Sequence, residues 1–338
     1  MFVAVEETTD TRTEADKACK QKCYVCPKCR KSVVFAQGPK IRWHFRHKPN
    51  SECPYHNGET WQHEQAKFAI LSGARSRGLA AEPELEVLSL DGDRRADVVI
   101  WAPQTDPPRP DDHRRYAFEV QYSALETAAL DTRTNAYMAA GVPVIWIPVV
   151  DSVKLFGTDN KPKLVEKISG TNLFRAYAYS APFWIEHIEK FLGHIWLYIP
   201  QTKSFWKGWL LSHFLYKNPS EGHDADGNEF SSGGYWYEAK LLHDLYLEGP
   251  YYFDDVRVSR VNHPDNSNIP ANGRRKFLVD LRPHGKDSIS GRRAGKRRRT
   301  HDNGFADYAD WVLTGDGWQL AVFEALDVLP SADAPLPT

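Results

Sequence analysis

Apolar and polar residues repeat with the spacing of an α-helix in two segments of the first half of the chain. In residues 59–78 large apolar side chains recur among polar ones, and Gly78 closes the segment. Residues 124–140 carry a second such pattern, which Gly141 closes. Glycine just past a periodic segment is a common end to a helix. The sequence therefore predicts two helices.

Four apolar stretches have the composition and length of strands. Three lie between the predicted helices, at residues 84–90, 94–101 and 116–122, and the fourth is the run PVIWIPVV after Gly141. The segment TDPPRPDDHRR, between the second and third stretches, has three prolines and mixed charge, so we expect an exposed loop there. Helix, three strands, helix and strand follow one another within about 90 residues, an order that favours an α/β (α+β) fold.

The same patterns divide the chain into four parts. Residues 1–57 combine a predicted strand and turn with a segment rich in Cys and His, and residues 58–150 hold the α/β unit. Residues 151–325 contain aromatic segments such as HIWLYIP and SFWKGWLLSHFLY, which predict a folded C-terminal region of unknown fold. We expect these aromatic side chains to form a core rather than a base-stacking surface. Residues 326–338 are predicted to be a disordered tail.

Charge is unevenly distributed, although the chain as a whole is almost neutral. The 338 residues carry a formal net charge of -1, so any contact with nucleic acid must come from local basic patches. Residues 274–300 form such a patch, with eleven Lys and Arg against two Asp and a net charge of +9. Two interpretations stay open: a loop or arm that binds a phosphate backbone through Arg297, Arg298 and Arg299, or a solvated linker.

The location of the cysteines and the lack of long apolar runs indicate the cellular compartment. No apolar run is long enough to span a membrane, and residues 1–20 lack the apolar centre of a signal peptide. All five cysteines lie within residues 19–53, next to histidines, which favours metal ligation in a reducing compartment over a disulfide framework. We therefore expect a cytoplasmic protein.

The cysteine-rich segment has the spacing of a zinc site. Cys26 and Cys29 form a CxxC turn that presents two sulfur atoms to one ion. With His47 and Cys53 the spacing is C-x2-C-x17-H-x5-C, which predicts a tetrahedral Cys3His site. Because a closed four-ligand site has no open position, we expect this zinc to stabilise the fold rather than catalyse a reaction.

Two ligand positions of this site stay open on the sequence alone. His44 could take the place of His47, and Cys23 could compete with Cys53. A redox role for the CxxC turn is disfavoured, because no thioredoxin-like βαβ unit surrounds it.

Acidic residues occur inside two of the apolar predicted strands. Asp97 lies on the strand face opposite Val98 and Ile100, and Glu119 shares a face of the next strand with Gln121. A charged residue inside an apolar strand is unfavourable unless it is paired or binds a cation. Two carboxylates on adjacent strands repel unless a hard divalent ion lies between them. The pattern predicts a site for Mg²⁺ or Mn²⁺.

The preceding predicted helix carries three more residues with the right chemistry. Glu59, His63 and Lys67 are spaced i, i+4 and i+8, so they line one helix face. Together with the strand residues they could bind the cation, orient a water and stabilise charge on a scissile phosphate. For any one of them alone, a surface salt bridge around Arg94 or Arg95 is the alternative.

These motifs, in this order, resemble the competence protein CoiA-like family. The motifs are CPKC, RWHFRH and Cys53, followed by ETWQHEQAK, RRADV, FEVQYS, RTNAY and GVPVIWI, over roughly residues 1–150. That family is similar to PD-(D/E)XK nucleases. The resemblance implies a restriction-endonuclease-like core, a preceding zinc-ribbon-like module and a role in handling DNA in uptake or recombination.

The resemblance also implies roles for individual residues. Asp97 corresponds to the "D" of the motif, and Glu119 with Gln121 corresponds to "(D/E)XK". Gln121 stands where most of the superfamily has Lys, although an E-x-Q variant is familiar in this family. Gln can hold the attacking water but brings no positive charge, which Lys67 could supply from the helix. Glu59 and His63 correspond to the helix residues of the family.

Three functions are compatible with the sequence. The first is an active nuclease that hydrolyses phosphodiester bonds with Mg²⁺ or Mn²⁺. The second is a DNA-binding or DNA-processing adaptor that keeps the fold without turnover, with Gln121 as the feature that favours it. The third is a toxin or phage-defence effector with the same core. The sequence does not distinguish DNA from RNA.

Overall fold

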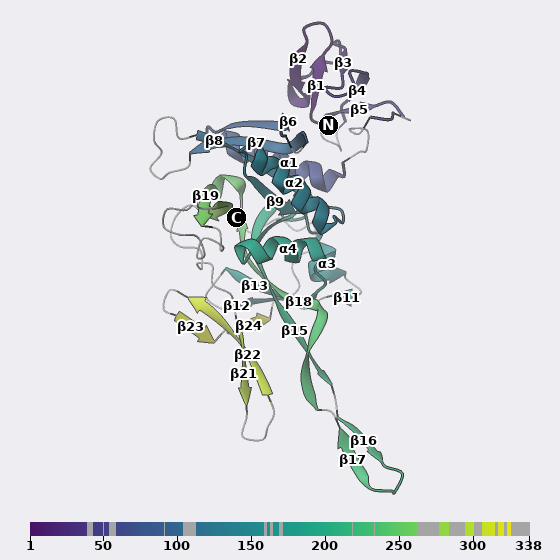
Figure 1. The fold of residues 1–338 in the computed structure, drawn as a ribbon, viewed down its shortest axis with the longest axis vertical. Coiled ribbons are helices and arrows are strands. Elements are labelled where there is room, and N and C mark those ends of the chain that lie inside the picture. The colour runs from purple at the N-terminus through teal and green to yellow at the C-terminus, as the bar shows by residue number, and fades with distance from the viewer. Residues whose placement is uncertain are drawn as a thin grey trace. The chain divides into compact units, whose positions relative to one another are not determined.

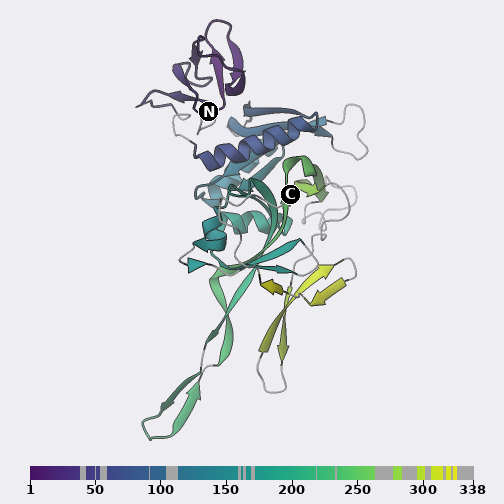
Figure 2. The same cartoon turned by 180° about the vertical axis from the view of Figure 1, so that it is seen from behind.

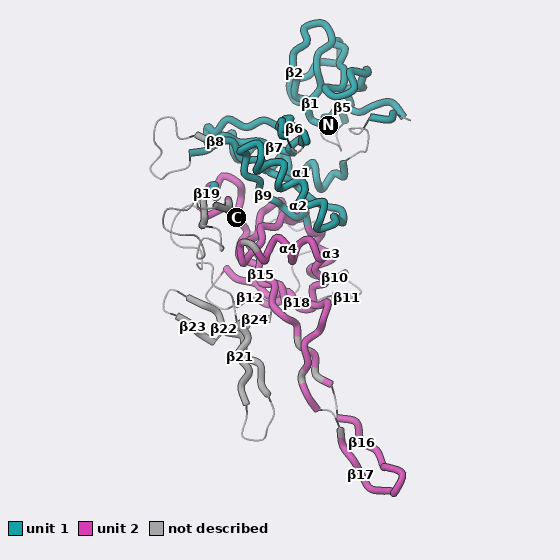
Figure 3. The backbone as a smooth tube through the Cα atoms, in the orientation of Figure 1, with its two compact units in different colours: residues 1–149, 258–260 teal, residues 150–257, 261–338 magenta. Residues whose placement is uncertain are grey.

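The structure is a computed structural model in which two compact units make up the chain, as Figure 3 shows. The first unit comprises residues 1–149 and 258–260, and the second comprises residues 150–257 and 261–338. The structure describes residues 1–325 apart from 39–42, 50, 54–58, 91, 104–112, 159–160, 163–164, 169–171, 218, 233, 263–276, 284–294, 301–305, 315–316 and 321–322. The predicted tail, 326–338, lies outside the described residues.

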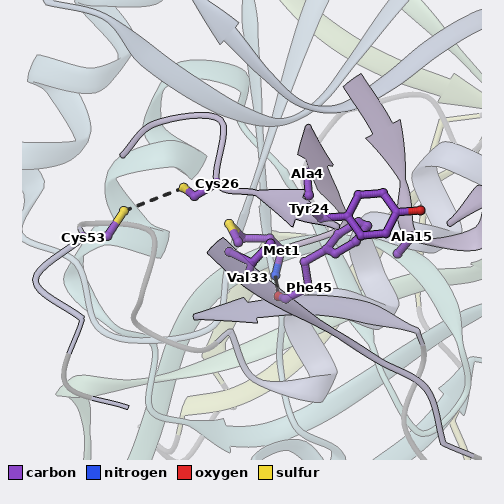
Figure 4. Close-up of a cluster of buried hydrophobic side chains, with 8 residues drawn as sticks. All are labelled: Met1, Ala4, Ala15, Tyr24, Cys26, Val33, Phe45 and Cys53. Atoms are coloured by element: carbon purple, nitrogen blue, oxygen red, sulfur yellow. Dashed lines mark hydrogen bonds between the residues drawn. The ribbon is translucent and has the colours of Figure 1, made fainter. Parts of the chain in front are cut away.

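The N-terminal module, residues 1–57, is built on a five-stranded antiparallel sheet with the order β2-β1-β3-β4-β5. Its strands are β1 (Val3–Glu6), β2 (Thr11–Glu14), β3 (Tyr24–Val25), β4 (Ser32–Ala36) and β5 (His44–His47), with a 3-10 turn at Ala15–Lys17. Figure 4 shows its small core, in which Tyr24 and Phe45 pack together with ring centroids 4.9 Å apart. The sequence predicted a single strand here, because segments this short show no clear alternation.

The rest of the first unit is a four-stranded sheet with two helices. In chain order these elements are α1 (Trp61–Ser76), β6 (Ala80–Val87), β7 (Arg94–Pro103), β8 (His113–Gln121), α2 (Thr127–Ala139) and β9 (Val144–Pro148). The sheet order is β6-β7-β8-β9, with β8 and β9 parallel and the other pairs antiparallel. Figure 2 shows α1 lying across these strands. The predicted mixed α+β fold and its order of elements are confirmed for this part of the chain.

Several predicted element bounds in this unit are corrected. Strand β8 begins at His113 rather than at 116, so it includes the last three residues of the expected loop, the rest of which, up to 112, lies outside the described residues. Helix α2 begins at Thr127 rather than at 124. Helix α1 begins only at Trp61, because the Thr60 hydroxyl accepts a hydrogen bond from the backbone N–H of His63 (3.3 Å) and so acts as the N-cap. Glu59 therefore precedes the helix instead of forming part of its face. The first strand of the sheet is residues 80–87 rather than 84–90, and the leucines at 88 and 90 are exposed.

The strand register fixes where the acidic residues lie. Between β6 and β7, Pro83 lies opposite Val98 and Leu85 opposite Ala96, so Glu84 falls opposite Asp97. Between β7 and β8, Val98 lies opposite Phe118 and Val99 opposite Ala117, and the same register puts Asp97 opposite Glu119. Three carboxylates thus stand side by side across three strands.

The second unit consists mainly of strands. Its main sheet has six strands in the order β14-β15-β18-β13-β12-β24. Strands β15 and β18 are long and continue into the β16–β17 hairpin, so that they form the arm visible in Figure 1. The elements after β9 are α3 (Ser152–Phe156), β10 (Gly157–Thr158), β11 (Lys161–Pro162), β12 (Val165–Ile168), β13 (Leu173–Tyr179), α4 (Phe183–Leu192), β14 (Ile195–Ile199), β15 (Ser204–Lys217), β16 (Ser220–His223), β17 (Glu229–Ser232), β18 (Tyr235–Tyr251), a 3-10 turn at Phe253–Asp255, β19 (Val256–Asn262), β20 (Phe277–Pro283), β21 (Gly295–Thr300), β22 (Ala306–Thr314), β23 (Gly317–Leu320) and β24 (Phe323–Ala325).

Most of the described aromatic side chains of this region are buried, as the sequence predicted. Tyr198, Phe205 and Tyr246 are among the largest fully buried side chains of the protein. On the arm, by contrast, Tyr235 and Tyr237 are exposed. Phe183 at the start of α4 and Tyr252 after β18 are exposed as well. The aromatic composition therefore reflects a core, with exposed exceptions both on the arm and outside it.

The basic segment 274–300 forms two strands where the structure describes it. Residues 277–283 form β20, and residues 295–300, with Arg297, Arg298 and Arg299, form β21, which pairs with β22. A loop and a solvated linker are therefore both wrong for these stretches, and contact with nucleic acid stays a prediction. Residues 274–276 and 284–294 lie outside the described residues. Within the described part of the chain, no helix is long and apolar enough to cross a membrane.

Candidate metal and carboxylate sites

The small sheet of the N-terminal module brings four predicted zinc ligands together. Cys26 follows β3 directly, and its backbone N–H donates to the Lys31 carbonyl (2.9 Å), which closes the turn that carries Cys29. His47 is the last residue of β5, opposite Val33 of β4. This pairing brings a ligand more than a dozen residues further along the chain back to the CxxC turn.

Two distances between the four ligand atoms match those of a tetrahedral zinc site. The Sγ atoms of Cys26 and Cys53 are 3.8 Å apart (Figure 4), and the Sγ of Cys29 is 3.4 Å from the Nε2 of His47. All four ligand atoms lie within 4.8 Å of one another. Zinc–sulfur bonds of about 2.3 Å and zinc–nitrogen bonds of about 2.0 Å predict edges of about 3.8 Å and about 3.5 Å for a tetrahedron. This Cys/His cluster could therefore hold a metal such as zinc.

The two residues left open by the sequence take no part in this cluster. Neither His44 nor Cys23 belongs to the group of ligand atoms, and Cys23 is exposed. Burial raises the pKa of the Cys26 thiol to about 11. Metal binding must therefore displace a proton from Cys26, because zinc binds the thiolate.

The second site is centred on a lysine with no exposed surface. The Lys67 ammonium lies 2.7 Å from a carboxylate oxygen of Glu59, 2.9 Å from Glu84 and 3.6 Å from Asp97. Burial alone would lower the pKa of Lys67, but these three carboxylates raise it above its ordinary value, so the side chain stays charged. We call Lys67, its three carboxylates and His63 the Lys67 cluster.

Glu84 was not predicted as a site residue, although it has the densest set of partners. Its carboxylate accepts hydrogen bonds from the backbone N–H groups of Phe2 (2.9 Å) and Val3 (3.3 Å) and lies 3.5 Å from the Arg95 guanidinium. Burial would raise the pKa of Glu84, but the charges around it, with Lys67 foremost, lower it to about 2. Glu84 is therefore ionised at neutral pH.

Asp97 is held in place from three sides. One of its oxygens accepts from the backbone N–H of Val120 (2.8 Å) and lies 3.1 Å from the Nε2 of His63. Burial would raise the pKa of Asp97, but His63 and Lys67 hold it well below its usual range. Burial has the opposite effect on His63, whose pKa it lowers. The negative charge of Asp97 outweighs this effect, so the pKa of His63 is raised overall.

Glu119 has the opposite electrostatic character. Burial, and then the charge of Asp97, raise the pKa of Glu119 to about 7, although Arg133 and Tyr137 of α2 both contact its carboxylate. The guanidinium of Arg133 also stacks on the Trp146 ring, at 4.9 Å. Two carboxylates in register therefore differ in charge preference: Asp97 is firmly ionised, and Glu119 is near the point of protonation.

Gln121 stands two residues after Glu119 at the end of β8. Its side-chain amide donates to the carbonyl (2.8 Å) and the hydroxyl (3.1 Å) of Ser123. These hydrogen bonds fix the orientation of the amide next to the carboxylate pair.

The structure brings the six predicted residues of this site into one region, and it adds four that the prediction missed. Sequence signals existed for two of these, because Arg133 and Tyr137 both lie in the RTNAY motif and are spaced i, i+4 on one helix. No local signal separated Glu84 from the neighbouring glutamates. The sequence analysis named Arg95 only as a partner in a surface salt bridge.

The carboxylate pair suits a hard divalent cation by its donor type. Asp97 and Glu119 offer oxygen ligands, which Mg²⁺ and Mn²⁺ prefer. Burial and then repulsion from Asp97 raise the pKa of Glu119, and a cation between the two carboxylates would offset both effects. Among the described residues, no third Asp, Glu, His or Cys completes a metal-sized group here, so water or substrate would supply the remaining ligands.

Comparison with known protein families identifies the class of the two regions. Residues 7–56 match the family model described as competence protein CoiA, N-terminal domain, and residues 59–218 match competence protein CoiA, nuclease-like domain. The second match defines a nuclease-like protein and extends past the 150 residues that carry the resemblance in the sequence. The chain belongs to the competence protein CoiA-like family. Searches of curated proteins and of solved structures gave no match.

We predict that the Cys/His cluster binds one zinc per chain. Elemental analysis of protein purified without added metal should give close to one zinc per chain. Cys26→Ser should lose it and lower the melting temperature, because metal binding contributes on the order of 10 kcal/mol in small zinc modules.

Cys23→Ser is the matched control, since its thiol is exposed and lies outside the cluster. It should keep both the zinc and the melting temperature. A metal-free parent, together with a Cys26→Ser variant as stable as the parent, would rule out this zinc site.

Proposed function

We propose that this protein is a metal-dependent nuclease that hydrolyses phosphodiester bonds in DNA processing. The observation that carries the proposal is the pair Asp97 and Glu119, which lie in register on adjacent strands with opposed charge preferences. Membership of a family with a nuclease-like domain supports it. The element order, with an antiparallel three-stranded part and a parallel fourth strand, supports a restriction-endonuclease-like core.

Asp97 and Glu119 would hold the divalent cation. When bound, Mg²⁺ or Mn²⁺ would supply Lewis acidity and lower the pKa of a coordinated water. Asp97 is kept ionised by His63 and Lys67, so it is ready to act as a ligand at neutral pH. Glu119 would give up its proton on binding, since a nearby positive charge lowers the pKa of a carboxyl group.

The remaining residues have distinct roles in this proposal. Gln121, fixed by Ser123, would orient the attacking water through its amide group. Lys67 is fully buried, so it would act on the transition state through its charge and through Asp97 rather than by touching the substrate. His63 and Glu59 would hold Asp97 and Lys67 in position.

Arg133 adds a group that could contact the substrate directly. Its side chain is 31% exposed while it contacts Glu119. A guanidinium in this position can exchange a carboxylate for a phosphate, because the planar fork of Arg donors binds two oxygens of either group. We propose that Arg133 binds the phosphate next to the scissile bond.

One observation favours the alternative of an adaptor without turnover. The four carboxylates Glu59, Glu84, Asp97 and Glu119 are opposed by Lys67, Arg95 and Arg133, which contact them directly. The protein's own cations thus neutralise most of the acidic charge before any metal binds. A site of this kind would bind a divalent ion weakly, and the protein could then hold nucleic acid without cutting it.

We predict that Asp97→Asn and Glu119→Gln each lower metal-dependent cleavage by at least about 100-fold, the scale on which single electrostatic groups act in active sites. Both changes keep the side-chain shape, so the fold should persist. Cleavage is measured on single- and double-stranded DNA and RNA with Mg²⁺, Mn²⁺ or EDTA.

Glu126→Gln, an exposed carboxylate just before α2, serves as the control and should cleave like the parent. Gln121→Lys should keep or raise the activity, because it restores a positive charge beside the water position. Cleavage that survives both Asp97→Asn and Glu119→Gln would place the activity elsewhere. A parent that binds DNA but cleaves no substrate would favour the adaptor.

The basic strand β21 is proposed as a contact for nucleic acid. Replacing Arg297, Arg298 and Arg299 by Ala should weaken binding and flatten its salt dependence, since each lost phosphate contact lowers the log–log salt slope by about 0.9 for duplex DNA. Fluorescence anisotropy at several salt concentrations measures the slope.

A charge-matched control removes three exposed lysines elsewhere, Lys17, Lys20 and Lys190. The salt slope of that variant should differ from the slope of the parent by less than about 0.9, the value of one phosphate contact. Equal slopes for the arginine variant and the parent would contradict a contact of β21 with nucleic acid.

A further inference from the structure

Strand β6 carries three glutamates at alternate positions, and each of them contacts the N-terminal module. Glu82 lies 3.4 Å from the guanidinium of Arg12, and Glu86 lies 2.9 Å from the ammonium of Lys28. Glu84, between them, binds the backbone at the start of β1. The three side chains therefore form one row along the boundary between the module and the four-stranded sheet.

The middle glutamate differs sharply from its neighbours in burial. The side chains of Glu82 and Glu86 are 44% and 46% exposed, whereas that of Glu84 is 2% exposed. Exposed ion pairs contribute little to stability, but a buried carboxylate must keep its partners. Glu84 is thus the member of the row whose contacts are energetically consequential.

The contacts of Glu84 join the module to the Lys67 cluster. One carboxylate oxygen accepts from both the Phe2 backbone N–H (2.9 Å) and the Lys67 ammonium (2.9 Å). The Phe2 ring covers the same ammonium, with the nitrogen 5.0 Å from the ring centroid. The module therefore supplies part of the wall around Lys67.

The backbone at Glu84 is held in an unusual conformation. Its φ angle is +53°, in the left-handed region that non-glycine residues seldom adopt inside a strand. The pairing with β7 is nevertheless regular on both sides, at Pro83 and at Leu85. Such a conformation is strained for a non-glycine residue and persists where surrounding contacts fix the residue.

A short path of strand pairing leads from Glu84 to the Cys/His cluster. Phe2 and Val3 lead into β1, in which Val5 pairs with Val25 of β3. The next residue in the chain after Val25 is the metal ligand Cys26. Two paired strands therefore connect the CxxC turn with the backbone donors of Glu84.

We propose that Glu84 is a positioning residue that couples metal binding in the N-terminal module to the placement of Lys67. This inference rests on the proposed function for its effect on cleavage. Without the metal, β3 and β1 lose their anchor, the amides of Phe2 and Val3 leave Glu84, and the ammonium of Lys67 shifts away from Asp97. Coupling between two sites is reciprocal. If metal binding stabilises the contacts of Glu84, then loss of these contacts must weaken metal binding by the same free energy.

The test measures zinc affinity by competition with a chromophoric chelator in the full-length protein. Glu84→Gln should weaken zinc binding by about fivefold or more, the lower end of typical coupling between sites. Glu82→Gln and Glu86→Gln, which remove exposed contacts to the same module, should change it by less than about twofold.

A second control separates coupling from general loss of stability. Val99→Ala should lower the melting temperature from a buried position in the main sheet, in one hydrophobic cluster with Ala117 and Tyr137. If Val99→Ala and Glu84→Gln lower the melting temperature by similar amounts, Val99→Ala should still bind zinc with the affinity of the parent. An equal loss of zinc affinity in both variants, or parent affinity in Glu84→Gln, overturns the proposal.

Cleavage kinetics at saturating zinc give an independent readout. Glu84→Gln should lower kcat by about tenfold or more at unchanged KM, the pattern expected when an interaction specific to the transition state is lost. Glu84→Asp keeps the charge, and Asp tolerates the left-handed region, so it should recover part of kcat. An unchanged kcat in Glu84→Gln overturns the coupling to Lys67. If the parent cleaves nothing, the proposed function fails, and the zinc affinities alone decide whether Glu84 couples the two sites.

Discussion

A fully buried ammonium group organises the first unit of this protein. Lys67 has no exposed surface, and a charge in such a place is tolerated only with close partners of opposite sign. The partners come from three separate places: Glu59 from the segment before α1, Glu84 from β6 and Asp97 from β7. The helix, the sheet and, through Glu84, the N-terminal module must therefore assemble around one side chain.

This arrangement explains why two carboxylates in register behave differently. Asp97 receives the positive charges of His63 and Lys67, so its pKa falls. For Glu119, burial and the charge of Asp97 outweigh the effect of Arg133, so its pKa rises to about 7. A pair of this kind can accept a divalent cation with the loss of a single proton. The positively charged side chains around the carboxylates also reduce the net negative charge of the site. A nuclease would have to bind a divalent cation despite this, whereas an adaptor would not.

Much of the first unit could be predicted from the sequence because its signals are local. Helical periodicity gave α1 and α2, apolar stretches gave β7, β8 and β9, and ligand spacing pointed to Cys26 and Cys29. Asp97 and Glu119 were recognisable because a charge inside an apolar strand needs an explanation. These features depend on residues that are neighbours in the sequence.

The parts that escaped prediction depend on pairing between distant segments. Glu84 stands between Glu82 and Glu86, and the three are alike in type and spacing. The register with β7 and the position of Phe2 distinguish the middle one, and neither can be seen locally. The same holds for the second unit, where β13 pairs with β18 across about 70 residues of chain, so aromatic composition indicated a core but not its topology.

The most direct test of the metal-dependent nuclease is binding of the catalytic cation itself. Calorimetric titration of Mn²⁺ into the zinc-loaded protein, with a non-cleavable phosphorothioate DNA present, separates cation binding from turnover. We expect the parent to bind Mn²⁺ at a site distinct from the zinc, and Asp97→Asn to weaken this binding by about tenfold or more. Identical titration curves for the parent and for Asp97→Asn would contradict this expectation.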